Sequence, residues 1–428
     1  MAGTVDSQIR PPRLRIHRAW WVAAITLAAL VTASVFRSST GALLEPLENE
    51  FGWSRATTSG AVSLNLVLYG LAAPFAAAMM QRFGMRQVVV FALLLVALGS
   101  GLGLVMDQPW QLWLLWGVAI GVGTGCLALV FGAVVANRWF VRHRGLVMGF
   151  FSAASAAGQL VFLPVVVRLA EGPGWRYGAG LVTIAACALV PLVWLVLRDS
   201  PYDVGTAPYG ASPGWRPSSA ELKHQYVSLG ALAELRRVSR SGTFWILFGT
   251  FWICGWSTNG LIGTHLIPAA HDHGMSAPTS AGLLALIGLF DIVGTIASGW
   301  LTDRVDARRL LVVYYGLRGL SLLAVPYVLG PTVEPSLFFF IVFYGLDWVA
   351  TVPPTVALCR QHFGTERAAV VFGWVFAAHM VGAGVAASYA GWVRTVQGDY
   401  FSAWITAGIL CVGAAAACLL IPRRRVDL

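Results

Sequence analysis

Long apolar stretches alternate with short polar loops along the whole chain. Each stretch is long enough to cross a hydrocarbon core, which needs about 20 helical residues. We expect helices, because lipid leaves unpaired backbone groups without a partner and the residue-by-residue alternation of barrel strands is absent. The pattern predicts twelve membrane-spanning helices, at residues 19–43, 56–80, 87–106, 110–136, 145–167, 177–197, 243–268, 277–301, 310–330, 335–358, 367–392 and 399–421.

The two halves of the chain carry matching loops. Arg82 and Arg304 are separated by the same interval of sequence as Arg138 and Arg360, and all four follow apolar runs. This indicates a six-helix unit duplicated in tandem. We expect an all-α membrane protein divided into an N-terminal tail (1–18), a first bundle (19–198), a central loop (199–242), a second bundle (243–421) and a C-terminal tail (422–428).

Composition and charge support a membrane protein. Only 11% of residues are charged, whereas 57% are hydrophobic, more than a soluble surface tolerates. The net charge of +10 could indicate a nucleic-acid partner, but the arginines cluster in alternate loops and in the two tails. This is the positive-inside bias, which places both termini in the cytoplasm. We therefore expect a multi-pass protein of the inner (plasma) membrane that binds the lipid bilayer and no nucleic acid.

One loop points to a known family. The segment 299–304 (Gly-Trp-Leu-Thr-Asp-Arg), followed by two arginines, resembles the signature loop of the major facilitator superfamily. The resemblance implies two six-helix bundles related by a pseudo-two-fold axis, with the substrate held between them. It also implies a gating role for the residues of this loop and of its first-half copy, namely Arg82, Arg86, Asp303, Arg304 and Arg308.

The two copies of the gating loop differ at an acidic position. Gln81 stands in the first copy where the family pattern has an acidic residue, and Asp303 stands in the second. Asp303 could hold this end of the protein shut against the positive N-terminus of span eleven. We therefore expect Asp303→Asn to impair transport more than Gln81→Ala.

Three further segments resemble a narrower group of relatives. Residues 50–55, 144–149 and 198–205 are similar to the corresponding motifs of bacterial monocarboxylate-porter-like proteins, relatives of the oxalate/formate antiporter branch. These motifs belong to the scaffold of the fold. They therefore indicate the subfamily rather than the molecule carried.

Five ionisable side chains fall well inside predicted spans, where a charge costs roughly 2.5–3.5 kcal/mol, and His265 lies near the outer end of span seven. Arg318 lies on span nine, which the resemblance makes an outer scaffold helix, so we expect it to pair with Asp347 or Asp291. Asp291 is either that partner or a proton site, since a partly dry cavity favours a neutral carboxyl. His379 is either a ligand for substrate or proton or a packing residue. Arg37 either binds a carboxylate or extends to the outer headgroups.

Polar and aromatic side chains on the expected cavity helices complete the candidate site. Aromatic walls with a few hydrogen-bonding groups suit a small, partly apolar organic molecule. The candidate substrate-binding residues are Arg37, Asn65, Tyr69, Gln159, Trp256, Asn259, Tyr344 and His379, and the candidate proton-coupling residues are Asp291 and His379.

These features favour a secondary transporter that takes up a small organic anion, such as a monocarboxylate, with protons. The alternatives are a proton-driven exporter of amphipathic molecules and, from another class, a membrane enzyme or sensor. The sequence contains no Walker-type phosphate loop, no clustered nucleophile and base, and no metal-ligand spacing. We therefore expect a non-enzymatic monomer without cofactor or metal, whose partner is a small-molecule substrate.

Overall fold

The computed structural model describes residues 17–171, 173–212 and 230–423; no side chain is described at 36–45, 55–56, 156, 159–164, 166–167, 170–171 and 277–278. The helices of the first half are α1 (Arg18–Phe51), α2 (Arg55–Phe83), α3 (Met85–Gly103), α4 (Pro109–Leu112), η1 (Trp113–Ile120), α5 (Gly121–Cys126), α6 (Leu129–Trp139), α7 (Arg144–Glu171) and α8 (Trp175–Val196).

The second half repeats this order after a linking segment. The short helices η2 (Pro201–Val204) and α10 (Ala231–Val238) belong to the link. The second half then comprises α11 (Gly242–Gly255), η3 (Trp256–Ile262), α12 (Gly263–Asp272), α13 (Ala277–Thr302), α14 (Ala307–Val328), α15 (Pro335–Asp347), α16 (Val352–Phe363), α17 (Thr365–Gln397) and α18 (Phe401–Leu419).

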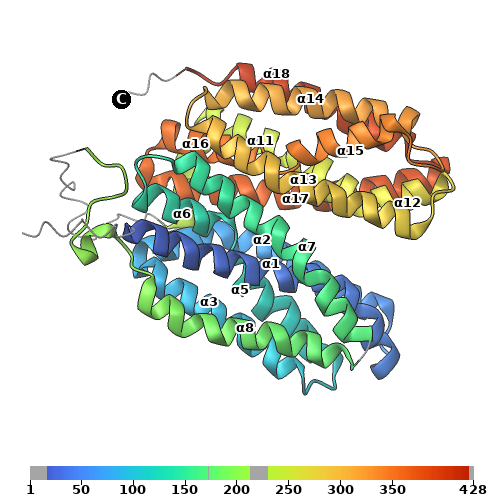
Figure 1. Cartoon of the computed structure of the whole chain (residues 1–428), viewed down its shortest axis with the longest axis horizontal. Helices are drawn as coiled ribbons and strands as arrows, with labels where there is room; N and C mark the ends of the chain where they lie inside the picture. The colour runs from blue at the N-terminus through green and yellow to red at the C-terminus, as the bar shows by residue number, and fades with distance from the viewer. Residues whose placement is uncertain (1–16, 172, 213–229, 424–428) are drawn as a thin grey trace, which may run out of the picture.

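The helices agree with the predicted spans. Within the described residues, ten segments are long and apolar enough to cross a membrane. The two remaining predictions, at 145–167 and 243–268, coincide with α7 and with the consecutive helices α11, η3 and α12. Figure 1 shows the two halves as separate bundles that meet at one end and diverge toward the other. The predicted all-α membrane fold of two bundles is confirmed.

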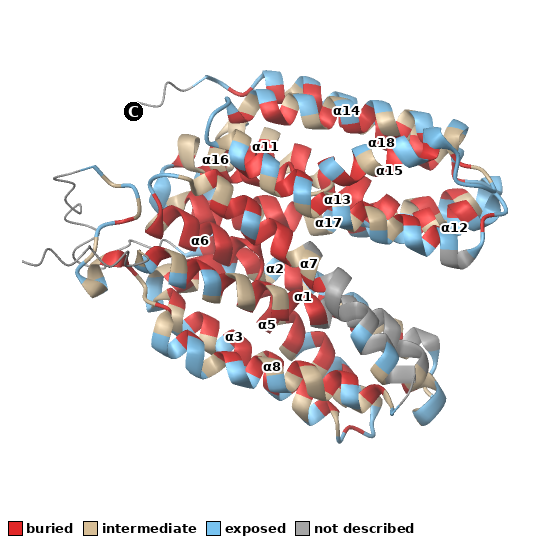
Figure 2. Cartoon of the chain, in the orientation of Figure 1, coloured by how far each residue is buried: buried red, intermediate tan, exposed pale blue. Residues whose placement is uncertain are grey.

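The outer surface of both bundles is apolar. Large hydrophobic side chains are exposed on α3, α8, α14 and α18, as the pale blue positions along these helices show (Figure 2). Such a surface would aggregate in water, but it matches the acyl chains of a bilayer. Buried residues, in red, concentrate where the two bundles meet (Figure 2).

The two bundles are locked together at one end, which we call the arginine-rich end because the basic loops 82–86, 138–144 and 304–309 lie there. The Asp303 carboxylate accepts the backbone N–H of Gly145 at 2.8 Å and of Leu146 at 3.0 Å. These groups form the N-terminus of α7, where a negative charge is stabilised. A Cβ at Gly145 would collide with the Gly299 carbonyl, so glycine is required for this close approach of α7 and α13.

The expected partner of Asp303 was wrong. Asp303 binds the N-terminus of α7, in span five, whereas the side-chain amide of Gln81 donates to the Glu366 carbonyl at the start of α17, in span eleven. The pseudo-symmetry explains the exchange, because α2 packs along α17 and α13 packs along α7. Each gating loop therefore contacts the opposite half.

The predicted gating arginines stay within their own halves. The guanidinium of Arg82 lies over the Phe83 ring and that of Arg86 over the Trp194 ring. Arg304 donates to the Trp300 carbonyl, and Arg308 donates to carbonyls at the end of α18. Among the five predicted gating residues, Asp303 is the one whose described contacts cross between bundles.

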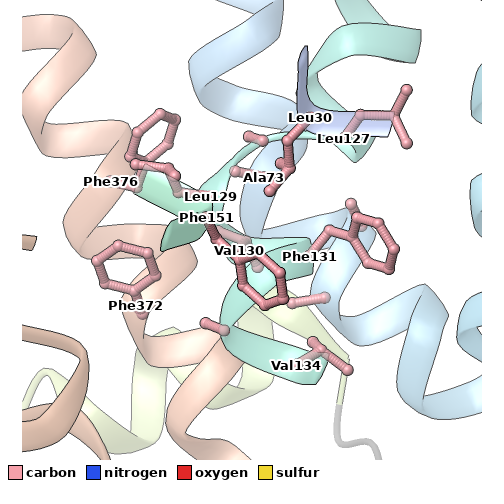
Figure 3. Packing of buried hydrophobic residues seen from close by; sticks show 14 of the residues in the cluster. Leu30, Ala73, Leu127, Leu129, Val130, Phe131, Val134, Phe151, Phe372 and Phe376 are labelled. Carbon is pink, nitrogen blue, oxygen red and sulfur yellow. The ribbon is translucent and has the colours of Figure 1, made fainter. Parts of the chain in front are cut away.

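A layer of apolar side chains lies just beyond this lock, and we call it the inner plug: Leu129, Val130, Phe151, Phe372 and Phe376. Figure 3 shows the rings of α17 facing residues of α6 and α7. All five are buried. The plug therefore separates the arginine-rich end from the space between the diverging bundles.

At the opposite end, the ion pairs between described side chains join helices within one half only. Arg176 of α8 binds Glu50 of α1 at 2.6 Å, and Arg394 of α17 binds Asp272 of α12 at 2.5 Å. The hydrogen bonds from Arg394 lower the pKa of Asp272 from its usual value. The diverging bundles (Figure 1), together with the lock at the other end, indicate a conformation open at this end.

The second bundle contains one fully buried ion pair, between Arg318 and Asp347. Arg318 Nε lies 2.6 Å from Asp347 Oδ2, and neither side chain is exposed by more than 7%. The same guanidinium donates to the carbonyls of Asp347 and Trp348, where α15 ends inside the bundle. Arg318 therefore satisfies both a buried carboxylate and the free carbonyls of a broken membrane helix.

We predict that Asp303→Asn weakens the lock more than Gln81→Ala. The substitution removes the charge that complements the α7 N-terminus, whereas Gln81 contributes one neutral hydrogen bond. Amide hydrogen exchange at residues 145–148 should rise at least tenfold in Asp303→Asn, and transport rates should fall more than in Gln81→Ala. Asp306→Asn is the control, since Asp306 caps α14 within its own half. Equal exchange in the Asp303 and Gln81 variants would contradict this prediction.

We also predict that Arg318→Met destabilises the protein by about 3–5 kcal/mol, because it leaves the Asp347 carboxylate buried without a partner. Adding Asp347→Asn should restore part of this loss by removing the buried charge. The unfolding midpoint of purified protein measures both effects. If the Arg318→Met protein were as stable as the unchanged protein, the ion pair would have no structural role.

Candidate functional site

A cavity of about 750 Å³ lies between the two halves, on the far side of the inner plug from the arginine-rich end. Side chains of α2, α6 and α7 line it from the first half. Side chains of α11, η3, α12, α13, α16 and α17 line it from the second half. This volume suits a small molecule. Any movement of one half against the other must change the shape of this cavity.

His379 and Asn259 form the polar centre of the lining. His379 Nε2 lies 3.4 Å from Asn259 Nδ2, and the ring is flanked by Phe251 and Phe376 at centroid distances of 5.0 and 6.0 Å. Among the described residues, none forms a hydrogen bond with His379 Nδ1, although this atom is buried. The imidazole therefore retains a ring nitrogen that is able to bind a further polar group.

Close helix packing brings these two residues together. A Cβ at Gly255 would collide with the His379 carbonyl, so glycine allows α11 and α17 to approach at this level. η3 continues α11 directly, and it carries Asn259 toward the same cavity. The position of His379 thus depends on a contact between residues that are far apart in the sequence.

Asp291 of α13 lies at the edge of the cavity and is 1% exposed. Its Oδ1 accepts the Thr295 hydroxyl at 2.7 Å and the Val349 backbone N–H at 2.9 Å. The N–H of Val349 is available because α15 ends two residues earlier. Across the described part of the chain, Asp291 forms no ion pair. Arg318 pairs with Asp347 instead, so the structure does not support Asp291 as the structural partner of Arg318.

Tyr69 also lines the cavity and packs edge-on against Phe376 of the other half, with ring centroids 5.6 Å apart. Two other candidates have side chains that are not described, Arg37 and Gln159, so their predicted roles lie outside the described residues.

Three predicted substrate-binding residues lie outside the cavity lining. The Asn65 amide donates to the Trp116 carbonyl at 2.6 Å, and the Tyr344 hydroxyl donates to the Ser257 carbonyl at 2.7 Å. Trp256 packs between Trp252 and Tyr389. These side chains hold helices together, and we remove them from the candidate site. The polar groups of Asn65 and Tyr344 bind backbone carbonyls because polar side chains in membrane helices find partners on neighbouring helices.

The cavity also contains residues that the sequence argument passed over. Phe251, Cys254 and Thr258 recur at helical spacing on one face of α11 and η3, and all three line the cavity. The sequence argument selected Trp256 and Asn259 on these helices, of which Asn259 lines the cavity and Trp256 does not. Cys254 Sγ lies 3.2 Å from Arg318 Nη1 and 3.3 Å from the Thr351 hydroxyl, which connects the cavity wall to the buried ion pair.

Comparison with known proteins places this architecture in a family. Residues 25–387 match the model of the Major Facilitator Superfamily. An uncharacterized MFS-type transporter of Bacillus subtilis, YcxA, is 25% identical, with 96% of each chain covered. Monocarboxylate transporter 11 of Mus musculus is 27% identical over 94% of this chain and 87% of its own length. Monocarboxylate transporter 13 of Bos taurus is 26% identical over 86% and 80%.

Solved structures show the same fold at low sequence identity. The human organic anion transporter MFSD10 superposes with a TM-score of 0.72 at 16% identity, covering 96% of this chain and all of that chain. The transporter FucP in its outward conformation superposes with a TM-score of 0.68, also at 16% identity, over 95% of this chain and all of its own. The match of the family model over most of the chain, together with the two-bundle fold, shows that the chain belongs to the Major Facilitator Superfamily and is a membrane transporter.

Proposed function

We propose that the protein is a secondary active transporter that takes up a small organic anion of the monocarboxylate class together with a proton, by alternating access. The observation that carries this proposal is the polar centre of the cavity, where His379 and Asn259 face a space enclosed by both halves.

The chemistry of the lining supports a small carboxylate. A protonated His379 and the Asn259 amide could donate to the two oxygens of a carboxylate, and charge-assisted hydrogen bonds of this kind are the strong ones. The rings of Tyr69, Phe251 and Phe376 offer an apolar surface to a short carbon chain. Among relatives, several are named monocarboxylate transporters, and one structural neighbour is named an organic anion transporter.

Asp291 supports proton coupling. It is a buried carboxyl at the cavity edge, and it lacks a cationic partner within the described residues. Its protonation would remove a charge that the low-dielectric surroundings disfavour. A proton carried with a monovalent anion also makes the loaded state neutral, which avoids the cost of about 2.3 kcal/mol per charge per 100 mV of membrane potential.

Topology supports the direction of transport that we propose. We place the arginine-rich end in the cytoplasm, by the positive-inside rule, and therefore place both tails and the central loop there. The conformation described then opens away from the cytoplasm of an inner (plasma) membrane, ready to receive external substrate. We further propose that the protein functions as a monomer, with domain boundaries at 1–18, 19–198, 199–242, 243–421 and 422–428.

We predict that small monocarboxylates raise the unfolding midpoint of the purified protein, and that His379→Ala and Asn259→Ala each weaken binding tenfold or more. Losing one hydrogen bond to a charged group costs about 1.5–3 kcal/mol, which corresponds to this loss. A thermal-shift titration with acetate, lactate and pyruvate measures it, and His271→Ala is the control because His271 is exposed at the open end. Stabilisation by bulky organic cations alone would refute the organic-anion assignment. Arg37→Gln tests the remaining cationic candidate in the same titration.

We predict that Asp291→Asn uncouples uptake from the proton gradient while leaving carboxylate binding within threefold of normal. The amide keeps the size of the carboxyl but cannot titrate. Uptake into proteoliposomes, with and without an inward proton gradient, measures the coupling. Asp107→Asn, at an exposed loop carboxylate, is the control. Undiminished gradient dependence in Asp291→Asn would show that the proton is carried elsewhere.

A further inference from the structure

A second cavity, of about 470 Å³, lies at the arginine-rich end, separate from the substrate cavity. Its walls come from three parts of the chain. The first half contributes Gln81 and the residues around Asn137 and Arg144, the linking segment contributes residues 200–208, and the second half contributes residues 363–369. A molecule bound here would touch both halves and the segment that connects them.

The N-terminus of α17 opens onto this cavity without a cap. α17 has 33 residues, and its N-cap residue, Gly364, provides no side-chain hydrogen bond. The first hydrogen bond of the helix runs from the Ala368 N–H to the Gly364 carbonyl. The backbone N–H groups of the residues between them therefore have no partner within the helix. Such a turn carries a partial positive charge that favours an anion.

The symmetry-related helix receives a carboxylate from the opposite half, which α17 does not receive from any described residue. The N-terminus of α7 is capped by the carboxylate of Asp303 from the opposite half. Gln81 occupies the corresponding place beside α17, and its amide donates to the Glu366 carbonyl without bringing a negative charge. Among the described residues, the α7 end is therefore capped by a carboxylate of the opposite half, whereas the α17 end has only Glu366 of its own first turn.

A buried polar group in the same cavity is also without a partner. Asn137 of α6 is 7% exposed and lines the cavity, yet within the described residues its Nδ2 has no hydrogen bond. An unsatisfied buried donor costs about 1–3 kcal/mol and calls for a ligand. This observation does not depend on the helix end.

The surrounding charge is positive. The lining includes Arg138, Arg144 and Arg367, against Glu366 alone. Arg367 has one loose pairing, at 3.9 Å from Glu234. Arg144 and the nearby Arg360 repel each other, and Asp303 offsets only part of this repulsion.

We propose that this cavity binds a phosphate-bearing anion, which caps α17, accepts the Asn137 amide and neutralises the surrounding arginines. A doubly charged tetrahedral phosphate matches several donors that converge from different directions, and the volume leaves room for an attached organic group. The group could belong to inorganic phosphate, to a soluble phosphomonoester or to a lipid headgroup. Because the site exists only while the two halves meet at this end, the bound anion stabilises the locked conformation and opposes inward opening.

The test uses the full-length protein in nanodiscs of phosphatidylcholine. Inorganic phosphate should raise the unfolding midpoint and slow amide exchange at residues 363–369, compared with chloride at equal ionic strength. Asn137→Asp and Arg367→Gln should each weaken the phosphate effect at least tenfold. Arg309→Gln, which removes an exposed arginine at the same end, should leave it unchanged. Gln81→Asp should protect the start of α17 without phosphate and abolish the response to it, because it supplies the missing carboxylate.

A second arm separates the sources of the phosphate. Nanodiscs containing phosphatidic acid, without free phosphate, should reproduce the effect only if a lipid headgroup reaches the site. A response to phosphatidic acid alone that Asn137→Asp abolishes assigns the site to lipid. The proposal is overturned if neither phosphate source acts on the unchanged protein. It is equally overturned if chloride acts as well as phosphate, or if properly folded Asn137→Asp and Arg367→Gln proteins respond like the unchanged one.

Discussion

The structure depends on one constraint, which is that no polar group can be left without a partner in hydrocarbon. Arg318 illustrates the rule, because it binds the Asp347 carboxylate and the free carbonyls at the end of α15. Asn65 and Tyr344 obey it by donating to backbone carbonyls of neighbouring helices. Two groups of the cavity lining stand out within the described residues: the buried Nδ1 of His379 has no hydrogen bond, and Asp291 forms no ion pair.

Duplication explains the frame of the molecule, and departures from symmetry explain its chemistry. Both halves contribute a gating loop, yet only the second carries a carboxylate that caps a helix of the other half. Both halves break the corresponding membrane helix, between α5 and α6 and between α15 and α16, yet only the second break is held by a buried arginine. The carboxyl and imidazole groups that line the described cavity, Asp291 and His379, also lie in the second half.

The sequence was sufficient to predict the helices, because membrane spans are set by the composition of about twenty consecutive residues. It also identified four residues that line the cavity, because ionisable or polar groups in apolar runs are few. These residues are Tyr69, Asn259, Asp291 and His379. It failed where the outcome depends on rotation of a helix about its axis. Each residue along a helix changes the direction of the side chain by about 100°, so Cys254 lines the cavity whereas Trp256, two residues further on, does not. The partner of Asp303 depended on which helices meet across the symmetry axis, and no local pattern encodes that.

The most direct test of the account is a pair of distance measurements across the halves in one sample. Spin labels at Asn49→Cys and His271→Cys report on the open end, with the exposed Cys187 replaced by serine; a second pair, on α2 and α17 at the arginine-rich end, reports on the lock. If the cavity is the site of alternating access, a bound carboxylate at acidic pH shortens the first distance and lengthens the second. Two distances that stay unchanged, or that change in the same direction, would contradict the account.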